Sequence, residues 1–74
     1  MIVIYSKNNC PACERAKALF KQNNLDFFVK NIDNDLDAMD FVVEQGHRAM
    51  PVVYLDDVFF PSAQAVINHV KDSK

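Results

Sequence analysis

The sequence predicts an α/β fold with one four-stranded mixed sheet and three helices, in the order β-α-β-α-β-β-α. Short apolar runs rich in β-branched and aromatic residues alternate with segments whose apolar residues recur at helical spacing. Near the C-terminal end, two such runs are separated only by Asp56 and Asp57, which is typical of an antiparallel hairpin. With 74 residues and no linker or repeat, the chain is expected to form a single domain over residues 1–74.

The first part of the chain has the pattern of a strand, a helix and a second strand. Residues 1–5 form a nearly continuous apolar run, which is typical of a central strand buried on both faces. Residues 11–24 have helical spacing, and Asn23-Asn24 is a plausible stop. Residues 26–32 are aromatic and β-branched, so we expect a strand parallel to the first one, joined by a right-handed crossover. The face of the helix expected to pack on the sheet consists of Ala12, Ala16, Leu19, Phe20 and Asn23.

A second helix is predicted between these strands and the hairpin. Asp33 or Asn34 is expected to cap it, and it should continue to about Gln45. Gly46 follows, where a residue of positive φ is needed to end a helix. Its buried face is expected to consist of Leu36, Met39, Val42 and Val43.

The hairpin strands are predicted at residues 52–55 and 58–60. Ser62 is the expected cap of the last helix, and residues 72–74 should form a frayed tail. The apolar stripe of this helix is Ala63, Val66, Ile67 and Val70. With helices on both faces of the sheet, the segment after the first strand falls at the strand's carboxyl end, where open α/β sheets usually place their chemistry.

That segment contains the two cysteines of the chain, in Cys10-Pro11-Ala12-Cys13. Pro11 suits the first helical position, so Cys10 falls at the N-cap, where unpaired N–H groups and the helix dipole stabilise a thiolate. We therefore expect the pKa of the Cys10 thiol to lie below the ~8.5 of a free thiol. Cys13, one turn into the helix, is within bridging reach. The pair is expected to be a dithiol that closes to a disulfide and reopens.

Charge is unevenly distributed. Residues 1–30 carry five Lys or Arg and two Asp or Glu, whereas residues 31–57 carry seven Asp or Glu and only Arg48 as a basic residue. This asymmetry is either an ordinary solvated surface or a field that steers a partner to the basic surroundings of the cysteines. The basic residues are neither numerous nor interleaved with aromatic residues, so we expect no nucleic-acid partner.

The remaining features of the sequence indicate the compartment of the protein. There is no signal-peptide pattern and no apolar run near the ~20 residues that a membrane-spanning helix needs, so no membrane segment is expected. Two closely spaced cysteines do not form the framework of a secreted disulfide-rich domain. We expect a cytoplasmic monomer whose thiols are reduced at rest.

Three segments are similar to a known family. Ile2-Val3-Ile4-Tyr5, Cys10-Pro11-Ala12-Cys13 and Met50-Pro51-Val52-Val53, with the element order between them, resemble the thioredoxin-fold superfamily and its glutaredoxin-like branch. The resemblance covers nearly the whole chain. Within the branch, residues 44–53 resemble the Q-G-x-R-x-x-P-V-V stretch of NrdH-redoxins, small hydrogen donors of ribonucleotide reductase.

The resemblance implies a thioredoxin-like (glutaredoxin) fold and a set of site residues. Cys10 and Cys13 would be catalytic in thiol–disulfide exchange. Met50-Pro51 would be a cis peptide bond that turns the Met50 backbone N–H and C=O toward the cysteines, where an extended substrate backbone can pair with them. The residues expected to contact the substrate or partner are Lys7, Pro11, Ala12, Arg48, Met50, Pro51 and Phe60.

Two of these assignments have an alternative. Arg48 adjoins Met50-Pro51 and either steers a partner or only makes the loop soluble. Phe59 and Phe60 cannot both face the core from one strand. One of them either lines the cysteine groove as a partner contact or, in the alternative, packs under the last helix. Tyr5 and Tyr54 are expected in the core.

Departures from the family patterns leave the electron source open. Glutaredoxins that use glutathione commonly carry Tyr where this chain has Ala12, and a Gly-Gly pair and an Asp where it has residues 59–64. Lys7 does match the basic residue that can hold a glutathione carboxylate. The W-S-G-F segment of NrdH-redoxins is also replaced, by Phe59-Phe60-Pro61-Ser62. Either thioredoxin reductase or glutathione is therefore the expected reductant.

The expected function is an electron carrier that reduces protein disulfides, with ribonucleotide reductase as substrate. One alternative is a glutathione-dependent glutaredoxin, and another is an iron–sulfur or metal-binding module that uses the same cysteines. A closed zinc site needs four ligands, and only His47 and His69 remain, at a spacing that fits no zinc finger. We expect neither a metal nor a tightly bound cofactor.

Overall fold

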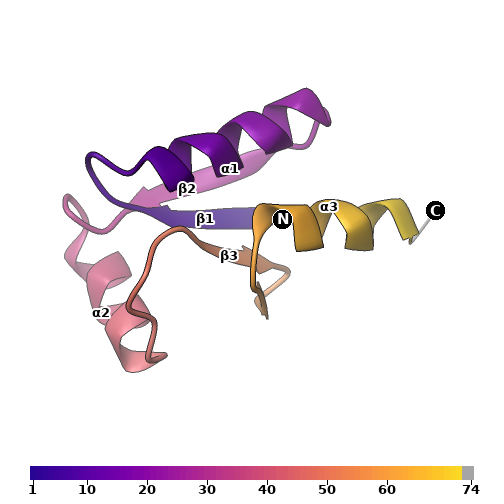
Figure 1. The fold of residues 1–74 in the computed structure, drawn as a ribbon. Coiled ribbons are helices and arrows are strands. Elements are labelled where there is room, and N and C mark those ends of the chain that lie inside the picture. Colours follow the sequence, from indigo (N-terminus) through magenta and orange to yellow (C-terminus); the bar gives the residue numbers. More distant parts are fainter. Residues whose placement is uncertain (73–74) are drawn as a thin grey trace.

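The computed structural model describes residues 1–72, and it contains the predicted elements in the predicted order (Figure 1). Two positions of the expected frayed tail, 73 and 74, lie outside the described residues, while Asp72 belongs to the last helix. The elements are β1 (Ile2–Ser6), α1 (Pro11–Gln22), β2 (Phe27–Asn31), α2 (Leu36–Glu44), β3 (Val52–Leu55), β4 (Val58–Phe60) and α3 (Ala63–Asp72).

The four strands form one mixed sheet in the order β2-β1-β3-β4. β1 lies between β2, which is parallel to it, and β3, which is antiparallel, so the expectation of a central first strand is confirmed. β3 and β4 form the predicted hairpin. Its turn residues Asp56 and Asp57 have φ values of 49° and 68°, the left-handed pair that suits a two-residue turn between twisted strands.

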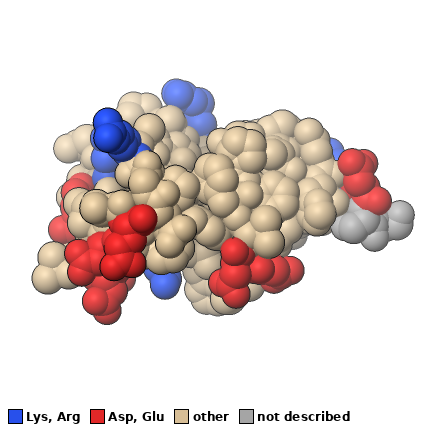
Figure 2. Space-filling view, turned by 90° about the horizontal axis from the view of Figure 1, so that it is seen from below, with Lys and Arg blue, Asp and Glu red and all other residues tan. Residues whose placement is uncertain are grey.

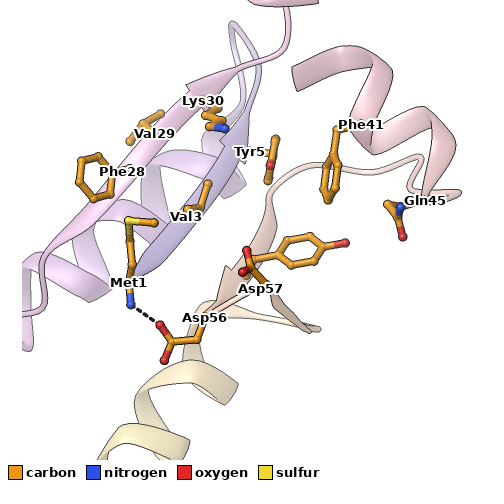
Figure 3. Close-up of a pocket in the computed structure, with 11 residues that line it drawn as sticks. Met1, Val3, Tyr5, Phe28, Val29, Lys30, Phe41, Gln45, Asp56 and Asp57 are labelled. Carbon is orange, nitrogen blue, oxygen red and sulfur yellow. Dashed lines mark hydrogen bonds and ion pairs between the residues drawn. The ribbon is translucent and has the colours of Figure 1, made fainter. Parts of the chain in front are cut away.

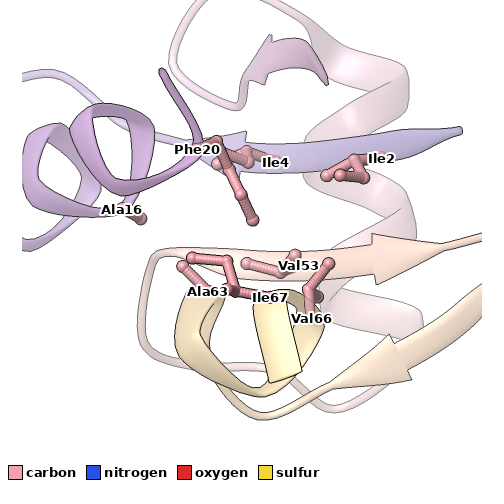
Figure 4. Packing of buried hydrophobic residues seen from close by; sticks show 8 residues of the cluster. All are labelled: Ile2, Ile4, Ala16, Phe20, Val53, Ala63, Val66 and Ile67. Carbon is pink, nitrogen blue, oxygen red and sulfur yellow. The ribbon is translucent and has the colours of Figure 1, made fainter. Parts of the chain in front are cut away.

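The helices cover both faces of the sheet, as expected. α1 and α3 pack side by side on one face (Figure 1). Between them and the sheet lies a core of buried residues, and Figure 4 shows these side chains converging from the two helices and the two central strands. The members of this core are Ile2, Ile4, Ala16, Phe20, Val53, Ala63, Val66 and Ile67. The second core, under α2, contains Tyr5, Ile32, Ala38, Val42 and Val52.

The prediction for the buried face of α2 was wrong at two positions. Leu36 is 82% exposed and Val43 is 63% exposed, while Ala38 and Val42 are buried. The helix has apolar residues on more than one face, and the sheet selects the face that brings the Phe41 ring onto Tyr5, with ring centroids 5.2 Å apart. The cap is Asp35, whose carboxylate accepts the Ala38 N–H at 3.1 Å, instead of Asp33 or Asn34.

α2 is short and covers only part of its face of the sheet. The uncovered part is a hollow of about 750 Å³ whose lining includes Val3, Phe28 and Tyr54 (Figure 3). At one end of it, the Met1 amino group is paired with the Asp56 carboxylate at 2.6 Å. None of the helices within residues 1–72 is long and apolar enough to cross a membrane.

Candidate active site

Cys10 and Cys13 are joined in a disulfide, with their Cα atoms 5.2 Å apart. Their exposure differs, because Cys13 is fully buried at 0% and Cys10 keeps 7% of its surface in contact with solvent. A thiol or disulfide of another molecule can therefore reach Cys10 and not Cys13.

The backbone around Cys10 confirms the predicted helix cap. Cys10 is the N-cap of α1, with φ −119° and ψ 94°, and Pro11 follows in the first turn. The Cys13 N–H donates to Cys10 Sγ at 3.2 Å. The sulfur therefore lies where a helix presents unpaired donors and the positive end of its dipole, which is the setting that favours a thiolate once the disulfide is reduced.

The Met50–Pro51 segment faces the disulfide. The Met50–Pro51 bond is cis, as the family resemblance implied, and the Met50 carbonyl oxygen lies 3.9 Å from Cys10 Sγ. Both residues are half-buried. The site therefore combines the end of β1 and the start of α1 with the beginning of β3, forty residues away.

The loop that leads to Met50 is directed by the end of α2. Gly46 has a φ of +80°, and its N–H donates to the Val43 carbonyl at 3.0 Å. The next residue, His47, donates its N–H to the Val42 carbonyl at 2.9 Å. This pair of bonds is the Schellman helix ending, so the role predicted for Gly46 is confirmed.

The loop that leads to Cys10 is bound to the end of β2 and to the segment after it. The Asn8 N–H donates to Asp33 Oδ2 at 2.8 Å, and the Asn31 Nδ2 donates to Asn8 Oδ1 at 3.0 Å. The Asp33 N–H in turn donates to Asn31 Oδ1 at 2.8 Å. The sequence pattern did not predict a role for these three residues. The available signal was that parallel strands end at one edge of the sheet, where Asn and Asp side chains commonly bond to backbone.

Aromatic rings hold the His47–Met50 loop on the other side. The His47 ring stacks on Phe59 with centroids 4.8 Å apart, and its Nε2 lies 3.1 Å from the Tyr54 hydroxyl. Burial raises the pKa of Tyr54, and nearby Tyr5 raises it further. Burial also raises the pKa of Tyr5, with smaller contributions from the carboxylates of Asp35 and Asp57. Tyr5 is in the core as predicted, and Tyr54 is half-buried.

Phe60 packs inward, whereas Phe59 is the exposed member of the pair. Phe60 lies against the core under α3, with the His69 ring 5.3 Å away, and so adopts the packing alternative. Phe59 is 46% exposed and lies beside His47. Of these two rings, Phe59 is the one next to the loop that carries Met50.

The other predicted contact residues lie at the surface. Lys7, Pro11 and Arg48 are exposed, and Ala12 is half-buried.

Lys17 pairs with Glu14 on α1. Acidic side chains gather at the end of the molecule where α2 lies (Figure 2). Within residues 1–72, no group of three or more His, Cys, Asp or Glu side chains is placed to hold a metal ion.

Most of the chain, including the cysteine pair and the Met50–Pro51 segment, matches known proteins in sequence. Residues 2–60 match the family described as Glutaredoxin. The chain belongs to the glutaredoxin family. Among its relatives is the glutaredoxin-like protein NrdH of Lactococcus lactis subsp. cremoris, which is 38% identical over 60 residues, or 81% of this chain and 83% of the relative. NrdH of Salmonella typhimurium is 37% identical over 57 residues, or 77% of this chain and 70% of the relative.

Solved structures show that this glutaredoxin has the thioredoxin-like fold. The NrdH-redoxin from Escherichia coli superimposes with a TM-score of 0.82 at 30% identity, covering 93% of this chain and 92% of the other. A buckwheat glutaredoxin–glutathione complex gives a TM-score of 0.73 at 25% identity, covering 99% of this chain and 70% of the other. This glutaredoxin is a thiol–disulfide oxidoreductase with a redox-active Cys-x-x-Cys pair.

Proposed function

We propose that this glutaredoxin is a cytoplasmic electron carrier that reduces a protein disulfide through Cys10 and Cys13, and that its substrate is ribonucleotide reductase. The observation that carries the reaction is the placement of Cys10 Sγ at the α1 N-cap, bonded to the Cys13 N–H, in a residue that keeps 7% of its surface exposed while Cys13 keeps none. The substrate is supported by the NrdH relatives and by the fit to the NrdH-redoxin structure. Reduced cysteines require a reducing compartment, which supports the cytoplasm.

In the first step, the Cys10 thiolate attacks one sulfur of the partner's disulfide. A Cys10–partner disulfide forms as the partner's S–S bond breaks, and the departing partner sulfur leaves as a thiolate that takes a proton from solvent. Because Cys13 is buried, Cys10 is the sulfur that makes this attack. The Met50 backbone, close to Cys10, supplies polar groups that can align the partner's chain at the attacked sulfur.

In the second step, the Cys13 thiolate attacks Cys10 Sγ. The Cys10–Cys13 bond forms, the mixed disulfide breaks, and the second partner sulfur leaves as a thiolate. Two electrons have then passed from the Cys10–Cys13 dithiol to the partner, and the carrier is in the oxidised form that the structure shows.

Thioredoxin reductase is the electron source that we propose. The Escherichia coli NrdH-redoxin, described as having a thioredoxin-like activity profile, supports this choice. The surface of the protein near the start of α3 supports it as well. Ser62 Oγ already accepts the Ala65 N–H at 3.2 Å, and residues 59–64 contain neither a glycine nor an acid that could hold glutathione.

Cysteine variants test the two-step reaction. Cys10→Ser should abolish reduction of ribonucleotide reductase, because the remaining thiol, Cys13, has no surface that a partner can reach. Cys13→Ser should accumulate the mixed disulfide, which mass spectrometry detects, and should not release the partner. In Cys10→Ser, serine keeps an oxygen that can cap α1, and in Cys13→Ser the Cys10 cap is unchanged, so both variants should fold. Full turnover of the protein disulfide by Cys13→Ser would refute the dithiol mechanism.

A comparison of reductants tests the electron source. The oxidised protein is incubated with NADPH and thioredoxin reductase, and separately with NADPH, glutathione reductase and glutathione, and NADPH consumption is followed. Turnover with thioredoxin reductase alone is the expected result. Efficient turnover with glutathione alone would instead support the glutathione-dependent alternative, for which the exposed Lys7 and the buckwheat glutaredoxin–glutathione complex are the favourable observations.

A further inference from the structure

The loop of residues 7–9 joins β1 to Cys10 and has little packing of its own. Lys7, Asn8 and Asn9 are all exposed, and Asn9 has a left-handed φ of 54°. Regular pairing of β1 with β2 ends at Ser6 and Asn31. Burial therefore contributes little to holding this loop, and hydrogen bonds must hold it.

Apart from the Ser6 hydroxyl, which donates to the Lys7 carbonyl at 3.4 Å, the partners in these hydrogen bonds are the last residue of β2 and the segment that follows it. Asn8 is bound through its backbone N–H to Asp33 and through its side-chain oxygen to Asn31. Asn31 and Asp33 are themselves joined, so the three residues form a closed ring of bonds that we name the Asn8 clamp. Asp33 is the ionised member, which makes its bond to the Asn8 N–H a charge-assisted one.

We propose that Asn8, Asn31 and Asp33 are positioning residues for the dithiol. They act through the loop, by holding Cys10 at the α1 N-cap and so setting how readily Cys10 and Cys13 close to a disulfide. This inference rests on the proposed thiol–disulfide exchange and adds to it the residues that adjust the equilibrium.

The physical link is the effective concentration of one sulfur at the other. Cys13 is fixed within α1 and fully buried. Cys10 lies outside the helix, with α1 on one side and the loop on the other, so a loosened loop lets Cys10 Sγ move away from Cys13. Ring closure then becomes less favourable, because closure of a dithiol depends on how well its two groups are held together.

The clamp should therefore affect one step of the reaction and not the other. Attack of the Cys13 thiolate on Cys10 requires the ring closure, so its rate should fall when the clamp is removed. Attack of Cys10 on an external disulfide requires no closure, so its rate should change little. The disulfide should also become easier to reduce, which is a more positive reduction potential.

The experiment uses Asp33→Ala, which removes the acceptor of the Asn8 N–H. In a dithiothreitol redox buffer, the equilibrium constant for disulfide closure should fall about threefold, which corresponds to a reduction potential about 14 mV more positive. Release of a small thiol from the Cys10 mixed disulfide should slow by a similar factor, while formation of that mixed disulfide changes less than twofold. Asp33→Asn keeps an acceptor for the Asn8 N–H, so its closure equilibrium constant and its release rate should lie close to those of the unaltered protein.

Asp40→Ala is the matched control, because it removes one exposed acid from α2 without touching the loop. An equal shift of the reduction potential in Asp40→Ala and Asp33→Ala would mean an effect of charge alone and would overturn the clamp. An unchanged reduction potential and release rate in Asp33→Ala would overturn it as well. If Asp33→Ala does not fold, Asn8→Ala removes only the bond to Asn31 and should shift both quantities in the same direction by a smaller factor. Absence of any such shift in Asn8→Ala overturns the clamp in that case.

The outcome also separates the clamp from the proposed function. If the unaltered protein shows no reversible Cys10–Cys13 couple in the redox buffer, the proposed function fails and the clamp fails with it. If the unaltered protein shows the couple and the clamp variants match it, only the clamp fails.

Discussion

The disulfide should stabilise the fold by a small amount that can be worked out. Cys10 and Cys13 are three positions apart, so they close one of the shortest loops a disulfide can make. In the chain-entropy treatment, a loop of about four residues removes roughly 6 cal/mol/K from the unfolded chain, which is about 1.9 kcal/mol at room temperature. The hydrogen bond from the Cys13 N–H to Cys10 Sγ can form in both redox states, so its contribution largely cancels.

Urea unfolding of the oxidised and the dithiothreitol-reduced protein measures this difference. The oxidised form should be more stable by about 2 kcal/mol, and its Tm should be higher by roughly 8–15 °C for a domain of this size. The variant with Cys10→Ser and Cys13→Ser keeps a capping oxygen and has no disulfide, so dithiothreitol should not change its unfolding. Equal stability of the oxidised and reduced forms of the native sequence would refute the reasoning.

Two further predictions concern the accessibility and the protonation of named side chains. In the reduced protein, a brief iodoacetamide pulse should label Cys10 ahead of Cys13, because only Cys10 has surface in contact with solvent. Both cysteines fall on one tryptic peptide, so fragmentation in the mass spectrometer locates the label, and equal labelling of the two positions would contradict this. The fold raises the pKa of Tyr5 and Tyr54 above the ordinary value of 10.0, so at alkaline pH the folded chain holds protons that the unfolded chain loses. The free energy of unfolding should be unaffected well below pH 10 and should fall as the pH rises through and above it. Urea unfolding midpoints measured against pH should show a smaller fall in Tyr54→Phe. A fall of the same size in Tyr54→Phe would exclude Tyr54 as a contributor.

The features predicted correctly from the sequence are those set by neighbouring residues. The position of Cys10 at a helix N-cap follows from Pro11 one residue later, and the end of α2 at Gly46 follows from the need for a positive φ. The hairpin follows from two residues between two β-branched runs. Each of these signals lies within a few residues of the feature that it predicts.

The features that were missed depend on contacts between distant segments. α2 offers two apolar stripes, and which one is buried depends on where Tyr5 and Tyr54 place their rings on the sheet. Strand alternation shows that Phe59 and Phe60 face opposite ways, but not which of them meets α3. The bonds between Asn8 and Asp33 join residues twenty-five positions apart, across the edge of a sheet that has to form first.

The central position of β1 in the sheet determines how late in synthesis all of its neighbours become available. β1 is synthesised well before one of its two neighbours, β3, which begins at Val52. Until β3 and α3 have been made, Ile4 and Phe20 lack the side chains of Val53, Val66 and Ile67 that close their core. Because contacts so distant in sequence form late, the nascent chain has to carry the Cys10 thiol for 40 further positions before the carbonyl of Met50 can lie beside it.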